Sequence, residues 1–126
     1  YKRFLEIATK RKVKVIIVQA EDKIQIDKNT SLSILFPKQN LITTNTLNNN
    51  SIVAKFSYKL SNSQEFSILL TGDIEEIAEQ KLVQEYQNSN ALQATILKVA
   101  HHRLENFFYN RFFKLSKTKN CINWSR

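Results

Sequence analysis

Two residue types that commonly bind metal ions follow two apolar runs of the sequence. Asp73 comes directly after residues 66–72 (FSILLTG), and His101, with His102 beside it, comes directly after residues 94–100 (ATILKVA). In layered α/β folds, side chains at strand ends project from a rigid sheet into loops, where binding sites gather. Carboxylate oxygens and imidazole nitrogens are good ligands for zinc or manganese, and a carboxylate can bridge two metal ions. The spacing indicates a candidate metal site at Asp73 and His101.

Each of these residues also has a plainer interpretation. Asp73 precedes a run with helical spacing and is well placed as a helix N-cap, worth roughly 1 kcal/mol. Glu76, three residues later, would complete a capping-box pattern. His101 and His102 could be ordinary surface histidines. Spacing alone leaves both interpretations open.

The elements that must position these residues follow from the hydrophobic pattern. The β-branched run at residues 13–18 (VKVIIV) predicts a buried strand, and Gly72, the only glycine, stands between a strand and a helix. Pro37 ends a strand, because proline cannot donate to a β-ladder. The Asn- and Thr-rich residues 38–51 predict a loop. The remaining pattern predicts strands at 23–26, 31–36, 52–58 and 65–71, the last two as an antiparallel hairpin, then a helix at 74–86, a strand at 94–99, a helix at 105–115 and a strand at 121–124.

Strands therefore come first and α/β alternation follows, which predicts an α/β layered sandwich. The 126 residues suffice for one small domain or for part of a larger one. The chain begins with Tyr1 and contains no methionine, so we expect it to be a piece of a longer protein.

The charge balance favours a polyanionic partner. The formal net charge is +8, which suits nucleic acid or an anionic membrane surface, although a compositional bias toward lysine explains it equally well. Cys121 is the only cysteine, which excludes an internal disulfide and predicts a small buried side chain. No apolar run approaches the roughly 20 residues that span a bilayer. The lysines and arginine that could form a phosphate-binding face are Lys10, Arg11, Lys12, Lys14, Lys55 and Lys59.

Residues 66–102 resemble the metallo-β-lactamase domain of ComEC-type competence proteins. In that family a strand ends in Thr-Gly-Asp, a helix carries an Ala-Glu pair, and a later strand ends in Leu-Lys-Val-Gly-His-His-Gly-Ser, which matches Thr71-Gly72-Asp73 and Leu97-Lys98-Val99-Ala100-His101-His102 here. Upstream, residues 33–37 (SILFP) are similar to a family segment ending in Leu-His-Pro, and residues 50–53 (NSIV) are similar to Asn-Asn-Ser-Leu-Val. The resemblance covers roughly residues 5–120.

The resemblance implies a fold, a site and a cellular setting. The chain would be a single partial domain over residues 1–126, the C-terminal half of a metallo-β-lactamase αββα sandwich. Asp73 would be the metal-bridging aspartate and His101 the late histidine ligand of a zinc or manganese site, while His102 would orient the site or contact substrate. The family implies a nuclease-like, metal-dependent hydrolase acting on DNA, single-stranded DNA above all, beside the membrane channel portion of the parent protein, as an extracytoplasmic domain at the bacterial cytoplasmic membrane.

Two departures from the family pattern reduce the expected activity. The first metal motif of the family, His-x-His-x-Asp-His or a variant, is absent from the chain, and Arg103-Leu104 replaces the Gly-Ser that follows the histidine pair. We therefore expect this chain alone to be inactive as an enzyme, with metal bound by the intact domain. No small-molecule cofactor is expected. The alternatives are another metallo-β-lactamase-fold hydrolase, or a non-catalytic basic DNA-binding module.

Overall fold

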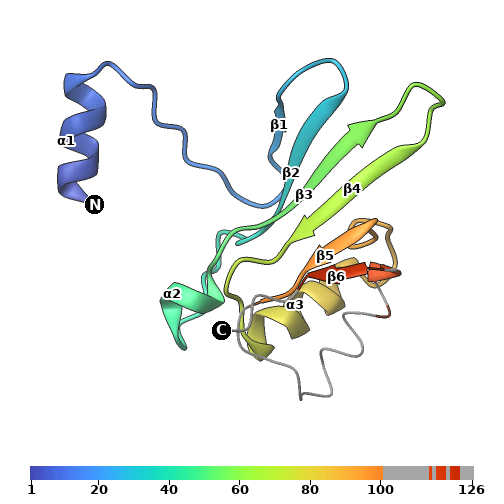
Figure 1. Cartoon of the computed structure of the whole chain (residues 1–126). Helices are drawn as coiled ribbons and strands as arrows, with labels where there is room; N and C mark the ends of the chain where they lie inside the picture. Colours follow the sequence, from blue (N-terminus) through green and yellow to red (C-terminus); the bar gives the residue numbers. More distant parts are fainter. Residues whose placement is uncertain (101–113, 115, 119, 123–126) are drawn as a thin grey trace.

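The chain adopts a mixed α/β fold, which agrees with the expected α/β class. The computed structural model describes residues 1–100, 114, 116–118 and 120–122 (Figure 1). The order is α1 (Lys2–Lys10), β1 (Lys23–Gln25), β2 (Thr30–Phe36), α2 (Thr46–Asn49), β3 (Val53–Lys59), β4 (Glu65–Leu70), α3 (Glu76–Tyr86), β5 (Ile96–Lys98) and β6 (Asn120–Ile122).

A single six-stranded sheet, in the order β1-β2-β3-β4-β5-β6, organises these elements. The first four strands pair antiparallel, and the expected β3–β4 hairpin is confirmed by the pairing of Lys59 with Glu65 beside the turn. Strands β4, β5 and β6 pair in parallel. Parallel neighbours need a crossover connection, and α3 supplies it between β4 and β5.

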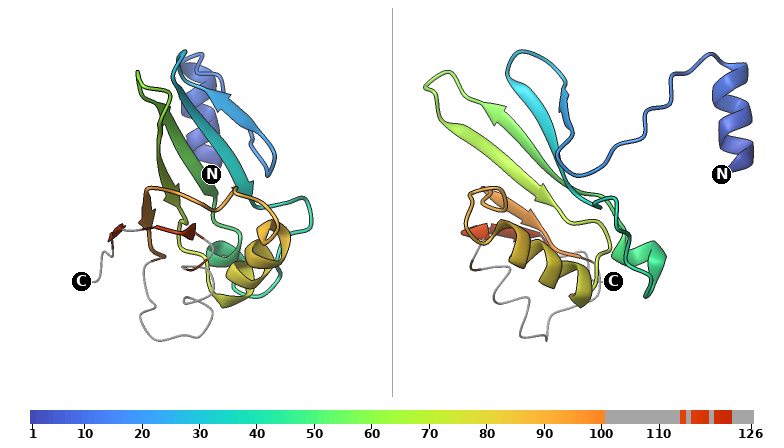
Figure 2. Two further views of the ribbon diagram at one scale, coloured as in Figure 1. Left: turned by 90° about the vertical axis from the view of Figure 1, so that its right-hand side faces the viewer. Right: turned by 180° about the vertical axis from the view of Figure 1, so that it is seen from behind.

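Helix α3 covers one face of the sheet and forms the main core with it (Figures 1 and 2). Leu69 of β4 and Leu97 of β5 are Cα partners and therefore lie on the same face. Both are almost completely buried in one apolar cluster with Ala78 and Leu82 of α3. The helix thus buries its apolar side against the β4–β5 half of the sheet.

The opposite face of the sheet is also apolar, but it is only partly buried. Cα partners share a face, so the register puts one continuous row of apolar side chains there. Ile24 and Tyr58 on this face remain 41% and 39% exposed, and no described helix lies over it (Figure 2). The row consists of Ile24, Leu32, Phe56, Ile68 and Ile96, with Tyr58 and Phe66 beside it.

The N-terminal segment corrects one prediction. Residues 13–18 form no strand, and the side chains of Val13 and Ile17 are 58% and 85% exposed. A β-branched run becomes a strand only where a neighbouring strand accepts its backbone hydrogen bonds, and β1 and β2 pair with each other instead. Helix α1, which the sequence pattern had not predicted, stands apart from the sheet at the end of this extended segment (Figure 1).

The remaining boundaries differ from the sequence predictions by small amounts. The predicted loop at 38–51 contains the short helix α2, and α3 begins at Glu76 rather than at Ile74. Strand β2 ends at Phe36, as Pro37 predicted. The predicted helix at 105–115 lies outside the described residues, and of the predicted strand at 121–124 only residues 121 and 122 are described, both in β6.

Candidate functional site

The carboxyl ends of β4 and β5 lie side by side in the sheet. These strands are parallel, and Leu70 pairs with Lys98. Asp73 follows Leu70 at the same separation at which His101 follows Lys98. The chain segments that lead to the two candidate ligands therefore leave the sheet from paired positions at one edge. His101 and His102 themselves lie outside the described residues.

A tight turn at Gly72 carries the chain from β4 to Asp73. Gly72 has a φ of +59°, in the left-handed region that glycine tolerates and that other residues rarely adopt. A Cβ atom built there would lie 2.7 Å from the Cβ of Ser51 and 3.1 Å from the carbonyl oxygen of Ile52. Glycine is required here both for the backbone angle and for the close approach of residues 51–52.

Hydrogen bonds to β5 fix the same turn. The hydroxyl of Thr71 donates to the carbonyl oxygen of Lys98 at 2.8 Å, and Thr71 is buried. The Nζ of Lys98 donates to the carbonyl oxygen of Gly72 at 2.9 Å and lies 3.9 Å from Oδ1 of Asp73. Lys98 therefore holds both the turn and the carboxylate. Sequence reasoning gave Lys98 no role, although a lysine inside an otherwise apolar strand was a visible signal.

The structure does not support Asp73 as the helix cap. The N-cap of α3 is Glu75, whose side chain makes no capping bond, so the helix begins two residues after the position that the sequence predicted. The fully buried Asn49 takes over at the start of the helix, because its Oδ1 accepts a hydrogen bond from the backbone nitrogen of Glu75 at 3.1 Å. Asp73 is therefore not the N-cap residue of α3.

An asparagine cluster ties α2 to the start of α3. Glu75 accepts hydrogen bonds from the side-chain amides of Asn45, Asn48 and Asn49. Asn49 also donates to the carbonyl oxygen of Thr44 at 2.9 Å. The Asn-rich stretch that predicted only a loop is thus a structural element that supports the turn at Gly72.

Asp73 is chemically suited to a metal ion, but the described residues do not complete a ligand set around it. Its side chain is 52% exposed at the end of a rigid strand. Hard oxygen donors of this kind suit manganese and also serve zinc. Within residues 1–100 and the described part of the C-terminal segment, no three or more His, Cys, Asp or Glu side chains lie together so that they could hold one metal ion. The proposed further ligand, His101, lies outside the described residues.

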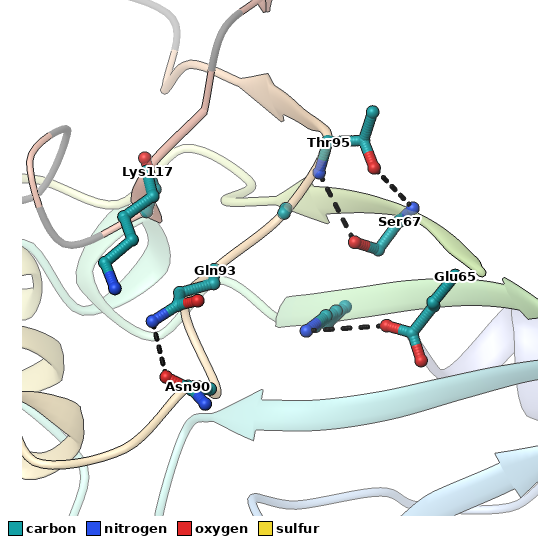
Figure 3. Close-up of a pocket in the computed structure, with 9 residues that line it drawn as sticks. Glu65, Ser67, Asn90, Gln93, Thr95 and Lys117 are labelled. Carbon is teal, nitrogen blue, oxygen red and sulfur yellow. Dashed lines mark hydrogen bonds and ion pairs between the residues drawn. The ribbon is translucent and has the colours of Figure 1, made fainter.

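A polar hollow of about 440 Å³ lies at the other end of β4, between the sheet and the segment that precedes β5 (Figure 3). The backbone nitrogen of Ser67 donates to the hydroxyl of Thr95 at 3.0 Å, and the backbone nitrogen of Thr95 donates to the hydroxyl of Ser67 at 3.3 Å. These reciprocal bonds extend the connection between β4 and the chain before β5. Lys55, Glu65 and Lys117 are the charged residues that line the hollow.

Comparison with known proteins adds no assignment. No family model matches the sequence, and neither a curated protein nor a solved structure matches the chain. Among the described residues, no helix is both long and apolar enough to cross a bilayer.

Proposed function

We propose that this chain is part of a metallo-β-lactamase-like αββα domain. In this proposal the domain belongs to a nuclease-like, metal-dependent hydrolase that is associated with DNA uptake. Asp73 and His101 are its metal ligands in this proposal, and His102 orients the site or contacts substrate. The observation that carries the proposal is the parallel pairing of Leu70 with Lys98. This register starts both ligand-bearing segments from the same sheet edge, as a shared metal site requires.

The two faces of the sheet support the sandwich architecture. One face is covered by α3, while the other presents the row from Ile24 to Ile96 without a described helix over it. Large exposed apolar patches on soluble domains mark surfaces that another element covers. A second sheet packs well on such a face, at a separation of about 10 Å. In the proposed domain this face packs against the second sheet of the αββα sandwich.

The contact between Ser51 and Gly72 supports the proposal independently. Residues 50–53 and 71–73 are separate segments of the family resemblance, and they meet where a Cβ on Gly72 would touch Ser51. Spatial convergence of both segments on the turn that carries Asp73 is expected if they serve one site.

The ligand set defines what the metal would do. Zinc or manganese held by Asp73 and His101 would supply a Lewis acid that activates water and stabilises charge on a phosphodiester. The protein's own residues prepare the place for it: Gly72 turns the chain, while Thr71 and Lys98 fix the turn to β5. The proposed location is an extracytoplasmic domain attached to the membrane channel portion of a DNA-uptake protein.

Zinc titration by calorimetry tests the ligand assignment. Catalytic zinc sites use three protein ligands, so two ligands predict weak binding by the isolated chain and no cleavage of single-stranded DNA. Asp73→Ala and His101→Ala should each abolish the weak binding, whereas the control Glu6→Ala, which removes an exposed carboxylate from α1, should retain it. Tight zinc binding with DNA cleavage at enzymatic rates, or binding that survives both substitutions, would overturn the proposal.

A further inference from the structure

A second polar surface lies on the α3 side of the sheet, over β1, β2 and β3. Lys23 of β1 pairs with Ser33 of β2, which pairs with Lys55 of β3, so the three side chains form one row on the α3 side of the sheet. The next row contains Gln25, Ser31, Ser57 and Ser67. Helix α3 covers only the β4–β5 half of this face (Figures 1 and 2), so Lys23 and Gln25 of β1 are exposed, while Ser31 and Ser67 are buried.

These rows enclose a hollow of about 370 Å³ that we call the lysine groove. Four lysines and a single glutamate line it, together with short polar side chains. Lys59 is brought beside the β1–β2 turn by the bond from its backbone nitrogen to the carbonyl oxygen of Asn29, at 2.9 Å. The charged residues are Lys23, Lys28, Lys55, Lys59 and Glu65.

Most of the positive charge in the lysine groove is not neutralised. Glu65 lies 3.7 Å from the Nζ of Lys55 and also accepts a hydrogen bond from the hydroxyl of Ser57. Lys23, Lys28 and Lys59 form no ion pair with any described residue, and all three are exposed. Like charges converging on one hollow favour an anionic ligand that spans them.

We propose that the lysine groove binds the phosphate backbone of single-stranded nucleic acid. Lysine ammonium groups and Ser, Asn and Gln side chains are the usual donors to phosphate oxygens, and such contacts position a strand without reading its sequence. No aromatic residue lines the groove, so base stacking contributes nothing and binding depends on charge. The neighbouring hollow shares Lys55 and Glu65 and adds Lys117, which extends the track along the sheet.

The groove suits a single strand better than it suits a membrane surface. Surface-binding elements insert large apolar side chains between lipids. The only apolar residues that line the lysine groove are Leu35, which is buried, and Ala91. The groove runs along β3 from Lys55, which pairs with Leu69 near the carboxyl end of β4, to Lys59, which pairs with Glu65 at the start of β4.

The test is the salt dependence of binding to a fluorescent oligothymidylate, measured by anisotropy in EDTA, which removes any contribution from metal. About four phosphate contacts predict a slope of log K against log salt of about −2.8, or an affinity loss of about 50-fold between 50 and 200 mM salt. The double variant Lys28→Gln/Lys59→Gln should reduce the magnitude of the slope, to about −1.4. The affinity loss over the same salt range should then fall to about 7-fold.

A charge-matched control separates a groove from general attraction. Lys2→Gln/Lys81→Gln removes the same charge from exposed sites outside the groove and should leave the slope unchanged. Equal effects of the two double variants, or no binding to the oligonucleotide, would overturn the proposal. Binding to anionic phosphatidylserine vesicles without binding to oligonucleotide would overturn it in favour of a membrane. Asp73→Ala should not affect binding, so the outcome is independent of the proposed metal site.

Discussion

The two ends of the sheet are built differently. At the carboxyl end of β4, Gly72 is pressed against Ser51, while Thr71 and Lys98 bond across to the neighbouring strand. At the other end of β4, Lys28 projects from the β1–β2 turn and Lys59 from the end of β3, and neither has an ion-pair partner among the described residues. A side chain that must hold an ion in place needs a rigid backbone beneath it. Exposed lysine side chains can instead change conformation to follow a flexible polyanion. The following substitutions test this difference, the largest expected effect first.

Gly72→Ala should be the most damaging single change at the rigid end. The alanine must adopt a left-handed backbone angle and must place its Cβ against Ser51, so we expect the free energy of unfolding in urea to fall by about 3 kcal/mol. The double variant Gly72→Ala/Ser51→Gly removes the facing Cβ and should recover part of that loss. If Gly72→Ala left stability unchanged, the turn would not be constrained as described.

Asn49→Ala should have the next largest effect. Asn49 is fully buried and bonds to both Thr44 and Glu75, so its truncation removes these bonds and leaves a cavity, and it should lower stability by about 2 kcal/mol. The matched control is Asn48→Ala, which lies in α2, removes a half-buried amide that also bonds to Glu75, and should lower stability by less than about 0.5 kcal/mol. Equal losses in the two variants would mean that Asn49 does not hold the start of α3.

The smallest effect concerns the turn that carries Lys28 at the adaptable end. The backbone N–H of Asn29 and the hydroxyl and N–H of Thr30 donate to Asp27 and hold the pKa of its carboxyl below the ordinary value of 3.8. Folding therefore favours the carboxylate, so its stabilising contribution is present above pH 3.8 and is lost as the pH falls through the lower folded pKa. The ¹³C shift of the Asp27 carboxyl should titrate below pH 3.8, and a midpoint at or above 3.8 would contradict this bonding.

The sequence predicted the central part of the fold because local pattern and tertiary pairing agree there. The alternation at residues 52–58 and 65–71 gave the β3–β4 hairpin almost to the residue, since one face of each strand is covered and the other is not. Residues 13–18 show the opposite case: their β-branched pattern is at least as strong, but no described strand accepts their backbone bonds. Propensity predicts where a strand can form, and pairing decides whether it does.

The sequence was enough to select the candidate site residues by their type. It did not reveal the residues that hold the turn around Asp73 in place. Asp73 was visible from the sequence because a carboxylate follows a strand and the sole glycine. Lys98, Ser51 and Asn49 were not assigned, because their roles depend on contacts between segments far apart in the chain. Such contacts leave no periodic signal, so only the folded structure reveals them.

The most direct measurement of the central claim is paramagnetic broadening of the amide resonances of the intact chain by manganese. The account predicts that substoichiometric Mn²⁺ broadens residues around Asp73 and at the end of β5, near Val99, and leaves the lysine groove around Lys59 sharp. His101→Ala should abolish the broadening at both strand ends together. Broadening centred on another carboxylate, such as Asp27, or broadening near Asp73 that persists without His101, would contradict a shared metal site at the carboxyl ends of β4 and β5.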